Sequence, residues 1–169
     1  IVLNNTSTSN GGTSFITDFS PASSDTIASA TFSTNPSENS TISPDDIKAL
    51  LDAGTDVNLQ ANNDITLSKA LSVDNTAGDG GALTLQAGRS INLNANLTTD
   101  NRDFIALAGD TNAISDNTDA GTATITIANG VTIDAGTGKI NLYANSGNFI
   151  NNSGSITPFT AGLTSIYLP

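Results

Sequence analysis

The sequence predicts an all-β protein, a parallel β-helix with one short α-helix at about residues 43–53. Three observations support this fold class. Triplets of the form apolar, small, apolar recur between residues 57 and 142. The stretches between them are rich in Gly and Asn, which tolerate the positive φ angles of tight corners. The triplets also return at intervals of about twenty residues, which is typical of solenoids whose repeats bury their apolar faces against one another.

Composition restricts the classes of function. The 169 residues are enough for one domain with its own core. Sixteen acids, fifteen of them Asp, oppose five bases and give a net charge of −11, which disfavours nucleic acids and anionic membrane surfaces as partners. His and Cys are absent, which removes the commonest metal ligand, the commonest general base and any disulfide. The absence of Met, even at position 1, indicates a processed chain or a piece of a longer one.

Residues 1–42 form a segment rich in Ser, Thr and Asn, with short apolar islands at 1–3, 14–19 and 26–32. Such a pattern suits short strands joined by polar loops, or a partly disordered arm. We expect short strands that join the β-helix.

Residues 43–53 carry the clearest helix signal in the chain. It consists of an N-cap, a proline at the first helical position, two acids at the positive end of the helix dipole and a terminal glycine, namely Ser43, Pro44, Asp45, Asp46 and Gly54. Ile47, Leu50 and Leu51 follow at helical spacing. This apolar face predicts that the helix packs on a flank or at one end of the β-helix.

Residues 54–169 contain the triplets that define the β-helix. Each triplet has Ile, Leu or Val at its ends and Asn, Thr or Ala at its centre, which predicts a short strand with one inward face. The predicted core consists of the end residues, namely Val57, Leu59, Ile65, Leu67, Leu83, Leu85, Ile91, Leu93, Ile105, Leu107, Ile125, Ile127, Val131, Ile133, Ile140 and Leu142. The polar central residues should face outward, namely Asn58, Thr66, Thr84, Asn92, Thr126, Thr132 and Asn141.

The triplets fall into pairs, 57 with 65, 83 with 91 and 125 with 131, so that the triplets at 57, 83, 105, 125 and 140 mark successive coils. An antiparallel sandwich would need longer strands joined by hairpins. Two or three short strands on different faces of one coil, each pairing with a strand about twenty residues away, explain both the brevity and the repetition. The segments 68–81 and 108–123 then form loops that leave one corner of the coil.

The chain resembles the filamentous-haemagglutinin-like exoproteins of bacterial two-partner secretion. The runs that carry the resemblance are TISPDDIKALLDAGTDVNLQANNDITL, GGALTLQAGRSINLNANL and TITIANGVTIDAGTGKINLYA, within about residues 42–144. The segment NPSE at 35–38 departs from the Asn-Pro motifs of the family's secretion-signal domain, so the chain resembles a repeat segment. The resemblance implies a right-handed parallel β-helix, or β-solenoid, in a secreted or cell-surface bacterial protein.

The resemblance also implies a non-catalytic role as an adhesin, rod or fibre segment. Its expected partners are neighbouring coils, copies of the chain itself, or a glycan or protein on a host or cell surface, with no nucleic acid and no membrane insertion. The C-terminal residues 149–168 retain apolar side chains. They are consistent with a last coil, a strand over the open end, or the start of a further coil.

The rival function is a carboxylate-dependent polysaccharide lyase or hydrolase on the same scaffold. Without His or Cys, such an enzyme would have to combine Asp with Lys or Arg. Asp64, Asp103 and Asp134 can meet only if the register of the coils aligns them, and the Asp45-Asp46 pair is explained by the helix dipole. We therefore expect no catalytic residue, although a cleft joining two or three Asp with a base would favour the enzyme.

Calcium and sugars are the remaining candidate ligands. Asp110, Asn112, Asp116 and Asp119 offer clustered oxygen atoms in one loop, but their spacing matches neither an EF-hand nor a calcium-binding nonapeptide repeat. The expected cofactor is none, with calcium as a weak candidate. Outward rows of Asn and Thr along a groove are suited to sugars, although the aromatic residues available for stacking are only two Tyr and six Phe.

Overall fold

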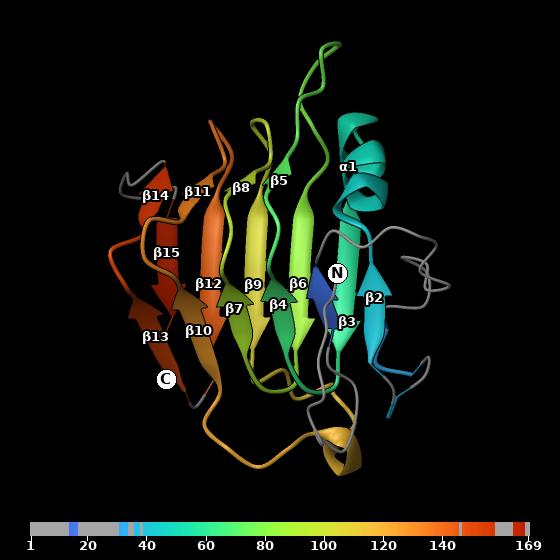
Figure 1. Cartoon of the computed structure of the whole chain (residues 1–169), viewed down its shortest axis with the longest axis vertical. Helices are drawn as coiled ribbons and strands as arrows, with labels where there is room; N and C mark the ends of the chain where they lie inside the picture. The colour runs from blue at the N-terminus through green and yellow to red at the C-terminus, as the bar shows by residue number, and fades with distance from the viewer. Residues whose placement is uncertain are drawn as a thin grey trace.

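The computed structural model describes residues 14–16, 31–33, 36–37, 39–145, 147–157 and 164–167. In this part of the chain, the strands lie in three parallel sheets, which we call A, B and C (Figure 1). From residue 57 the chain passes from sheet B to sheet A to sheet C and then returns to sheet B. Each such passage, which we call a circuit, adds one strand to every sheet. The predicted parallel pairing between successive circuits is confirmed.

The strands of each sheet are short. Sheet B has five, in the spatial order β15 (Thr164–Tyr167), β12 (Ile140–Ala144), β9 (Phe104–Ala108), β6 (Leu83–Ala87) and β3 (Val57–Ala61). Sheet A has six, in the order β13 (Asn148–Asn151), β10 (Thr124–Ile127), β7 (Ile91–Leu93), β4 (Ile65–Leu67), β1 (Ser14–Ile16) and β2 (Ser40–Ile42). Sheet C has four, in the order β14 (Ser155–Thr157), β11 (Thr132–Asp134), β8 (Leu97–Thr98) and β5 (Leu71–Ser72).

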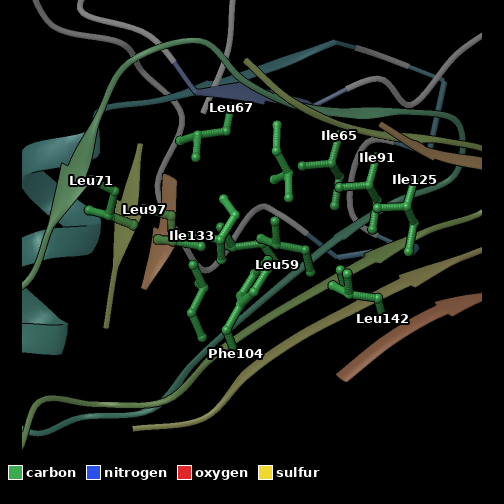
Figure 2. Close-up of a cluster of buried hydrophobic side chains, with 14 of the residues drawn as sticks. Leu59, Ile65, Leu67, Leu71, Ile91, Leu97, Phe104, Ile125, Ile133 and Leu142 are labelled. Atoms are coloured by element: carbon green, nitrogen blue, oxygen red, sulfur yellow. The ribbon is translucent and has the colours of Figure 1, made fainter. Parts of the chain in front are cut away.

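Alternation along each strand sends every second side chain into one continuous core. Figure 2 shows the result: Ile65, Ile91 and Ile125 form a row from sheet A on one side of the cluster, and Leu71, Leu97 and Ile133 form a row from sheet C on the other side. Both rows are fully buried. Because the pairing is in register, each buried residue rests on its equivalent in the neighbouring circuit.

The strand around residue 105 corrects one part of the predicted core. Phe104, Ala106 and Ala108 are the buried residues of β9, whereas Ile105 and Leu107 point outward and are only partly buried. The physical reason is the register with β6, in which Ala87 pairs with Ala108 and Gly88 and Gly109 form equivalent corners. The run FIALA is apolar at every position, so its own pattern does not say which face is inward.

The predicted grouping of the triplets is also wrong in part. β10 continues sheet A and β11 continues sheet C, so the triplets at 125 and 131 do not start a circuit as those at 57 and 83 do. The segment 68–81 is not only a loop, because it contains β5, with Leu71 and Val73 buried. The long loops leave two different corners: residues 73–82 lie between sheets C and B, whereas residues 109–123 lie between sheets B and A. The latter loop contains the 3-10 helix η2 (Ser115–Asn117).

The helix α1 (Pro44–Asp52) agrees with the sequence signals. The Oγ of Ser43 accepts the N–H of Asp45 at 3.1 Å, and Gly54 leaves the helix at a φ of +75°. Ile47 and Leu51 are fully buried, whereas Leu50 remains exposed. The helix lies against β3 and β5, which are the edge strands of sheets B and C, so it packs at one end of the stack of circuits, as predicted (Figure 1).

Polar side chains just before the strands connect successive circuits. Asp56, one residue before β3, accepts through Oδ1 the backbone N–H of Ala82, which is the equivalent residue before β6 (2.8 Å). The same relation joins four more pairs, namely Asp64 to Ser90, Ser90 to Thr124, Asn96 to Thr132 and Asp103 to Lys139. In each pair a side-chain oxygen takes the place of a backbone acceptor and extends the parallel ladder by one residue.

Both ends of the chain contribute strands to the sheets. Within residues 1–42, β1 and β2 are parallel strands of sheet A, and the apolar islands at 1–3 and 26–30 lie outside the described residues. At the other end, β13, β14 and β15 pair with β10, β11 and β12 in the same parallel sense. The C-terminal segment therefore completes one circuit and begins the next strand of sheet B.

Candidate functional site

A polar groove lies on the outer face of sheet B, where its strands begin. Its volume is about 590 Å³, within the range of small-molecule sites. Four successive circuits line it, with Asp56, Val57, Asn58, Asp79, Ala82, Thr84, Asn101, Arg102, Asp103, Ile105, Thr137, Gly138 and Lys139. We call this feature the sheet B groove. It crosses the starts of β3, β6, β9 and β12.

The floor of the sheet B groove is a row of outward side chains in exact register. Asn58 pairs with Thr84, and Thr84 pairs with Ile105. Alternation turns these residues outward because their neighbours Val57, Leu83 and Phe104 are buried in the core. The floor therefore presents an amide, a hydroxyl and an apolar surface side by side, one from each circuit.

The rim of the sheet B groove carries charge of both signs. Arg102 and Asp56 form an ion pair with 3.3 Å between Nη2 and Oδ1, and both side chains are well exposed. Lys139 adds a second cation, whereas Asp79 and Asp103 add two further carboxylates. Two of the five bases of the chain thus line this groove. The groove thus combines cationic and anionic side chains on a protein whose net charge is −11.

Two of the three carboxylates in the sheet B groove accept hydrogen bonds from backbone N–H groups. The Oδ1 of Asp56 accepts the N–H of Ala82 at 2.8 Å, in addition to its contact with Arg102. The Oδ1 of Asp103 accepts the N–H of Lys139, also at 2.8 Å. Both carboxylates keep lone pairs for further donors. The arrangement is suited to binding hydroxyl groups, whereas general acid catalysis at either residue would weaken a contact between circuits.

A second polar cluster occupies the corner between sheets B and A. Arg89 donates to Asp64 through Nε at 2.8 Å and through Nη2 at 2.5 Å, and its Nη1 lies 3.6 Å from a carboxylate oxygen of Asp119. The hydrogen bonds that Arg89 donates to Asp64 are the main cause that raises the pKa of Arg89, against the opposing effect of burial. Asn63 donates to Asp119 at 2.6 Å. This cluster fixes the loop 109–123 to the first two circuits and has a structural role.

The proposed calcium ligands are divided between different contacts. Asp110 is buried, and its carboxylate accepts the side-chain N–H of Gln86 at 2.9 Å and two N–H groups of Asn112 at 2.8 Å. Asp119 belongs to the Arg89 cluster, and Asp116 is exposed in η2. Among the residues that the structure describes, no three acidic side chains come together in a group able to hold a metal ion. Calcium at this loop stays the weak candidate that the sequence offers, and the expectation of no cofactor stays a prediction.

Of the three Asp residues considered for catalysis, Asp64 lies at the corner between sheets B and A, whereas Asp103 and Asp134 lie at opposite ends of the corner between sheets C and B, in successive circuits. Asp64 precedes β4 in sheet A, Asp103 precedes β9 in sheet B, and Asp134 ends β11 in sheet C. Asp134 accepts the N–H of Gly136 at 2.8 Å and so stabilises its own turn. The register does not align these residues, and of the three only Asp103 lies in the sheet B groove.

Sequence reasoning missed the group formed by Asp56, Asp79, Arg102 and Lys139. A signal was present, because Asp56, Asp103 and Lys139 each stand one residue before a strand of sheet B. Aligning the residues before the strands, rather than the triplets alone, places them in one row. A cleft that joins two or three Asp with a base was the sequence-based criterion for an enzyme. The sheet B groove meets this criterion in composition, since it joins three Asp with two bases.

A stacked pair of tyrosines lies farther along the outer face of sheet B. The rings of Tyr143 in β12 and Tyr167 in β15 are parallel within 5°, with centroids 4.4 Å apart. Burial, followed by the charge and hydrogen bond of Tyr167, raises the pKa of Tyr143.

Comparisons of the chain with protein-family models, curated proteins and solved structures found no match. Within the described residues, no helix has the length and apolar character needed to cross a membrane.

Proposed function

We propose that the chain is a non-catalytic structural and adhesive module, a right-handed parallel β-helix that forms a rod or fibre segment of a secreted bacterial surface protein. The observation that carries the proposal is the in-register stacking of buried rows through successive circuits, as in Leu71, Leu97, Ile133 and Ile156. A stack of this kind can be lengthened without changing its core. Right-handedness is supported by the near-universal hand of connections between parallel strands.

The surface chemistry supports an extracellular binding role. The polar outward rows and the charge of −11 keep such a rod soluble, and the likeness of its repeats to filamentous-haemagglutinin-like exoproteins supports secretion to the cell surface. The module would contact glycans or proteins through its sides, while its ends contact neighbouring coils or copies of the chain.

Bead retention tests the adhesive role. Beads coated with the folded protein should be retained on a layer of host cells or on bacterial cells. The matched control is Leu85→Asp, which places a charge at a fully buried position and should abolish the fold. Retention that is equal for both proteins would contradict an adhesive role of the folded module.

A carboxylate-dependent polysaccharide lyase or hydrolase is the second candidate, because the sheet B groove joins Asp56, Asp79 and Asp103 with Arg102 and Lys139. Incubation with neutral and acidic polysaccharides, followed by assays for reducing ends and unsaturated products, separates the two functions. We expect no product. Product formation that is lost in Asp103→Asn, while the variant remains folded, would favour the enzyme.

A further inference from the structure

The sheet B groove presents one outward side chain from each circuit, at the spacing of the strands. Neighbouring strands lie about 4.8 Å apart, which is comparable to the length of one pyranose unit in an extended β-1,4-linked chain. Asn58, Thr84 and Ile105 offer one outward side chain from each of three successive circuits. A linear sugar chain laid across the strands would therefore place successive rings over successive circuits.

The groups that line the sheet B groove suit hydroxyl-rich ligands. Arg102 and Lys139 donate hydrogen bonds, whereas the carboxylates of Asp56, Asp79 and Asp103 accept them. The guanidinium of Arg102 and the carboxylates are planar charged groups that form strong, directional hydrogen bonds. Each of them can bond to two neighbouring hydroxyl groups of a sugar ring at once. The partly exposed side chain of Ile105 provides an apolar surface for the C–H face of a sugar ring.

The charge of the sheet B groove selects among sugar chains. Three carboxylates face two cations at its rim, and the whole chain carries a net charge of −11. Polyanionic chains such as polyuronates would bring further negative charge into this field. A neutral chain loses nothing to this repulsion and can use donors and acceptors of both signs.

We propose that the sheet B groove binds a neutral, extended β-1,4-linked oligosaccharide, with its chain running across β3, β6, β9 and β12. This inference rests on the proposed adhesive function, to which it adds the ligand class and the binding surface. The sugar lies over the outward row, and its hydroxyls bond to Arg102, Lys139 and the free lone pairs of the carboxylates. No bond in the sugar is broken.

Titration of the protein with cellotriose, followed by calorimetry or by NMR of the backbone amides, tests the proposal. We expect saturable binding with a Kd below about 1 mM and shifts confined to the outer face of sheet B. Maltotriose, which has the same composition but a curved α-linked chain, and trigalacturonate, which is anionic, should bind at least about tenfold more weakly. Equal or stronger binding of either sugar would overturn the proposal, as would no detectable binding of cellotriose.

Variants locate the site. Arg102→Gln should weaken cellotriose binding by about tenfold, the loss expected when a charged hydrogen bond is removed, and Thr84→Ala should weaken it by several fold. The matched control is Thr126→Ala, which removes the same hydroxyl from an outward position in β10 of sheet A. Loss of binding that is equal in Thr84→Ala and Thr126→Ala would overturn the assignment to sheet B. Bead retention without cellotriose binding would refute this ligand alone, whereas release of glucose from cellotriose would refute the non-catalytic function itself.

Discussion

The Oδ1 atom of Asp64 accepts the backbone N–H of Ser90 at 2.9 Å, across one full circuit of the chain. The same carboxylate receives two hydrogen bonds from Arg89, the residue before Ser90. One side chain thus serves as a backbone acceptor for the next circuit and as the anion of a partly buried ion pair. The abundance of Asp in this sequence has a structural cause at such positions, because a carboxylate on a short stem reaches the neighbouring ladder.

This double role predicts different costs for two substitutions of Asp64. Asp64→Ala removes both the acceptor and the ion pair and should lower the free energy of unfolding by about 1 to 3 kcal/mol. Asp64→Asn keeps an acceptor oxygen for Ser90 and should cost less. Urea denaturation measures both values. Asp116→Ala, in the exposed η2, serves as the control and should change the free energy of unfolding by less than about 0.5 kcal/mol; a loss as large as that of Asp64→Ala would contradict the assigned role.

The observed register of β9 makes a prediction about its two faces. Phe104→Ala should cost about 3 to 5 kcal/mol, because Phe104 is fully buried. Ile105→Asn, on the outward face, should cost far less. Thermal or chemical denaturation of the two variants distinguishes the observed register from the one that the IAL triplet suggests. A greater loss of stability in Ile105→Asn than in Phe104→Ala would mean that Ile105 faces the core, as the triplet pattern predicted.

The alternation of β6 gives a matched pair at adjacent positions. Leu85→Asp places a charge in a fully buried site and should prevent folding, whereas Thr84→Asp places the same charge on the outer face and should leave the protein folded. Circular dichroism and denaturation midpoints report the difference. If the two variants behaved alike, the inward and outward assignment of sheet B would be wrong.

Gly88 tests how closely the corners of successive circuits approach. A Cβ atom at Gly88 would lie 2.1 Å from the backbone oxygen of Asn62 and 2.6 Å from the Cβ of Ala113, so Gly88→Ala should destabilise the protein by more than about 1 kcal/mol. Gly78→Ala is the control, because nothing lies within 4 Å of its added methyl group. Equal melting temperatures of the two variants would show that the corner is looser than described.

The tyrosine stack predicts a loss of stability at high pH. The pKa of Tyr143 is raised above its ordinary value near 10, so the folded state binds the phenolic proton more tightly than the unfolded state does. The contribution of the Tyr143 phenol to the free energy of unfolding is therefore complete below pH 10. It is lost as the pH rises through the pKa that Tyr143 has in the folded state. Urea denaturation across this range, with Tyr143→Phe as the control, measures the effect. An identical pH profile for wild type and Tyr143→Phe would contradict it.

Short-range patterns predicted those parts of the structure that local chemistry determines. The helix followed from Ser43, Pro44 and Gly54, and the inward faces of β3, β4, β6 and β7 followed from strict alternation. The triplet at 131 marked one strand of sheet C, but β5 and β8 were not predicted, because they have two residues each, too few to show a period.

The triplet pattern did not predict most residues of the candidate site. The sheet B groove combines residues of four circuits, and their alignment depends on loop lengths that vary from one circuit to the next. The error at Ile105 shows the same limit, since an apolar run gives no register without its corner glycine. Asp103 was recognised as a candidate, but its neighbours Asp56 and Lys139 become visible only when the residues before the strands are aligned.

Cross-linking of paired cysteines tests the stacked circuits most directly, because the chain has no cysteine of its own. The side chains of Thr66 in β4 and Asn92 in β7 meet at 3.4 Å across successive circuits. A short thiol-reactive cross-linker should therefore join Thr66→Cys to Asn92→Cys within one chain, in high yield by peptide mass spectrometry. It should not join Asn58→Cys to Thr66→Cys, which lie in different sheets. Efficient cross-linking of the second pair and none of the first would indicate a hairpin and contradict the account.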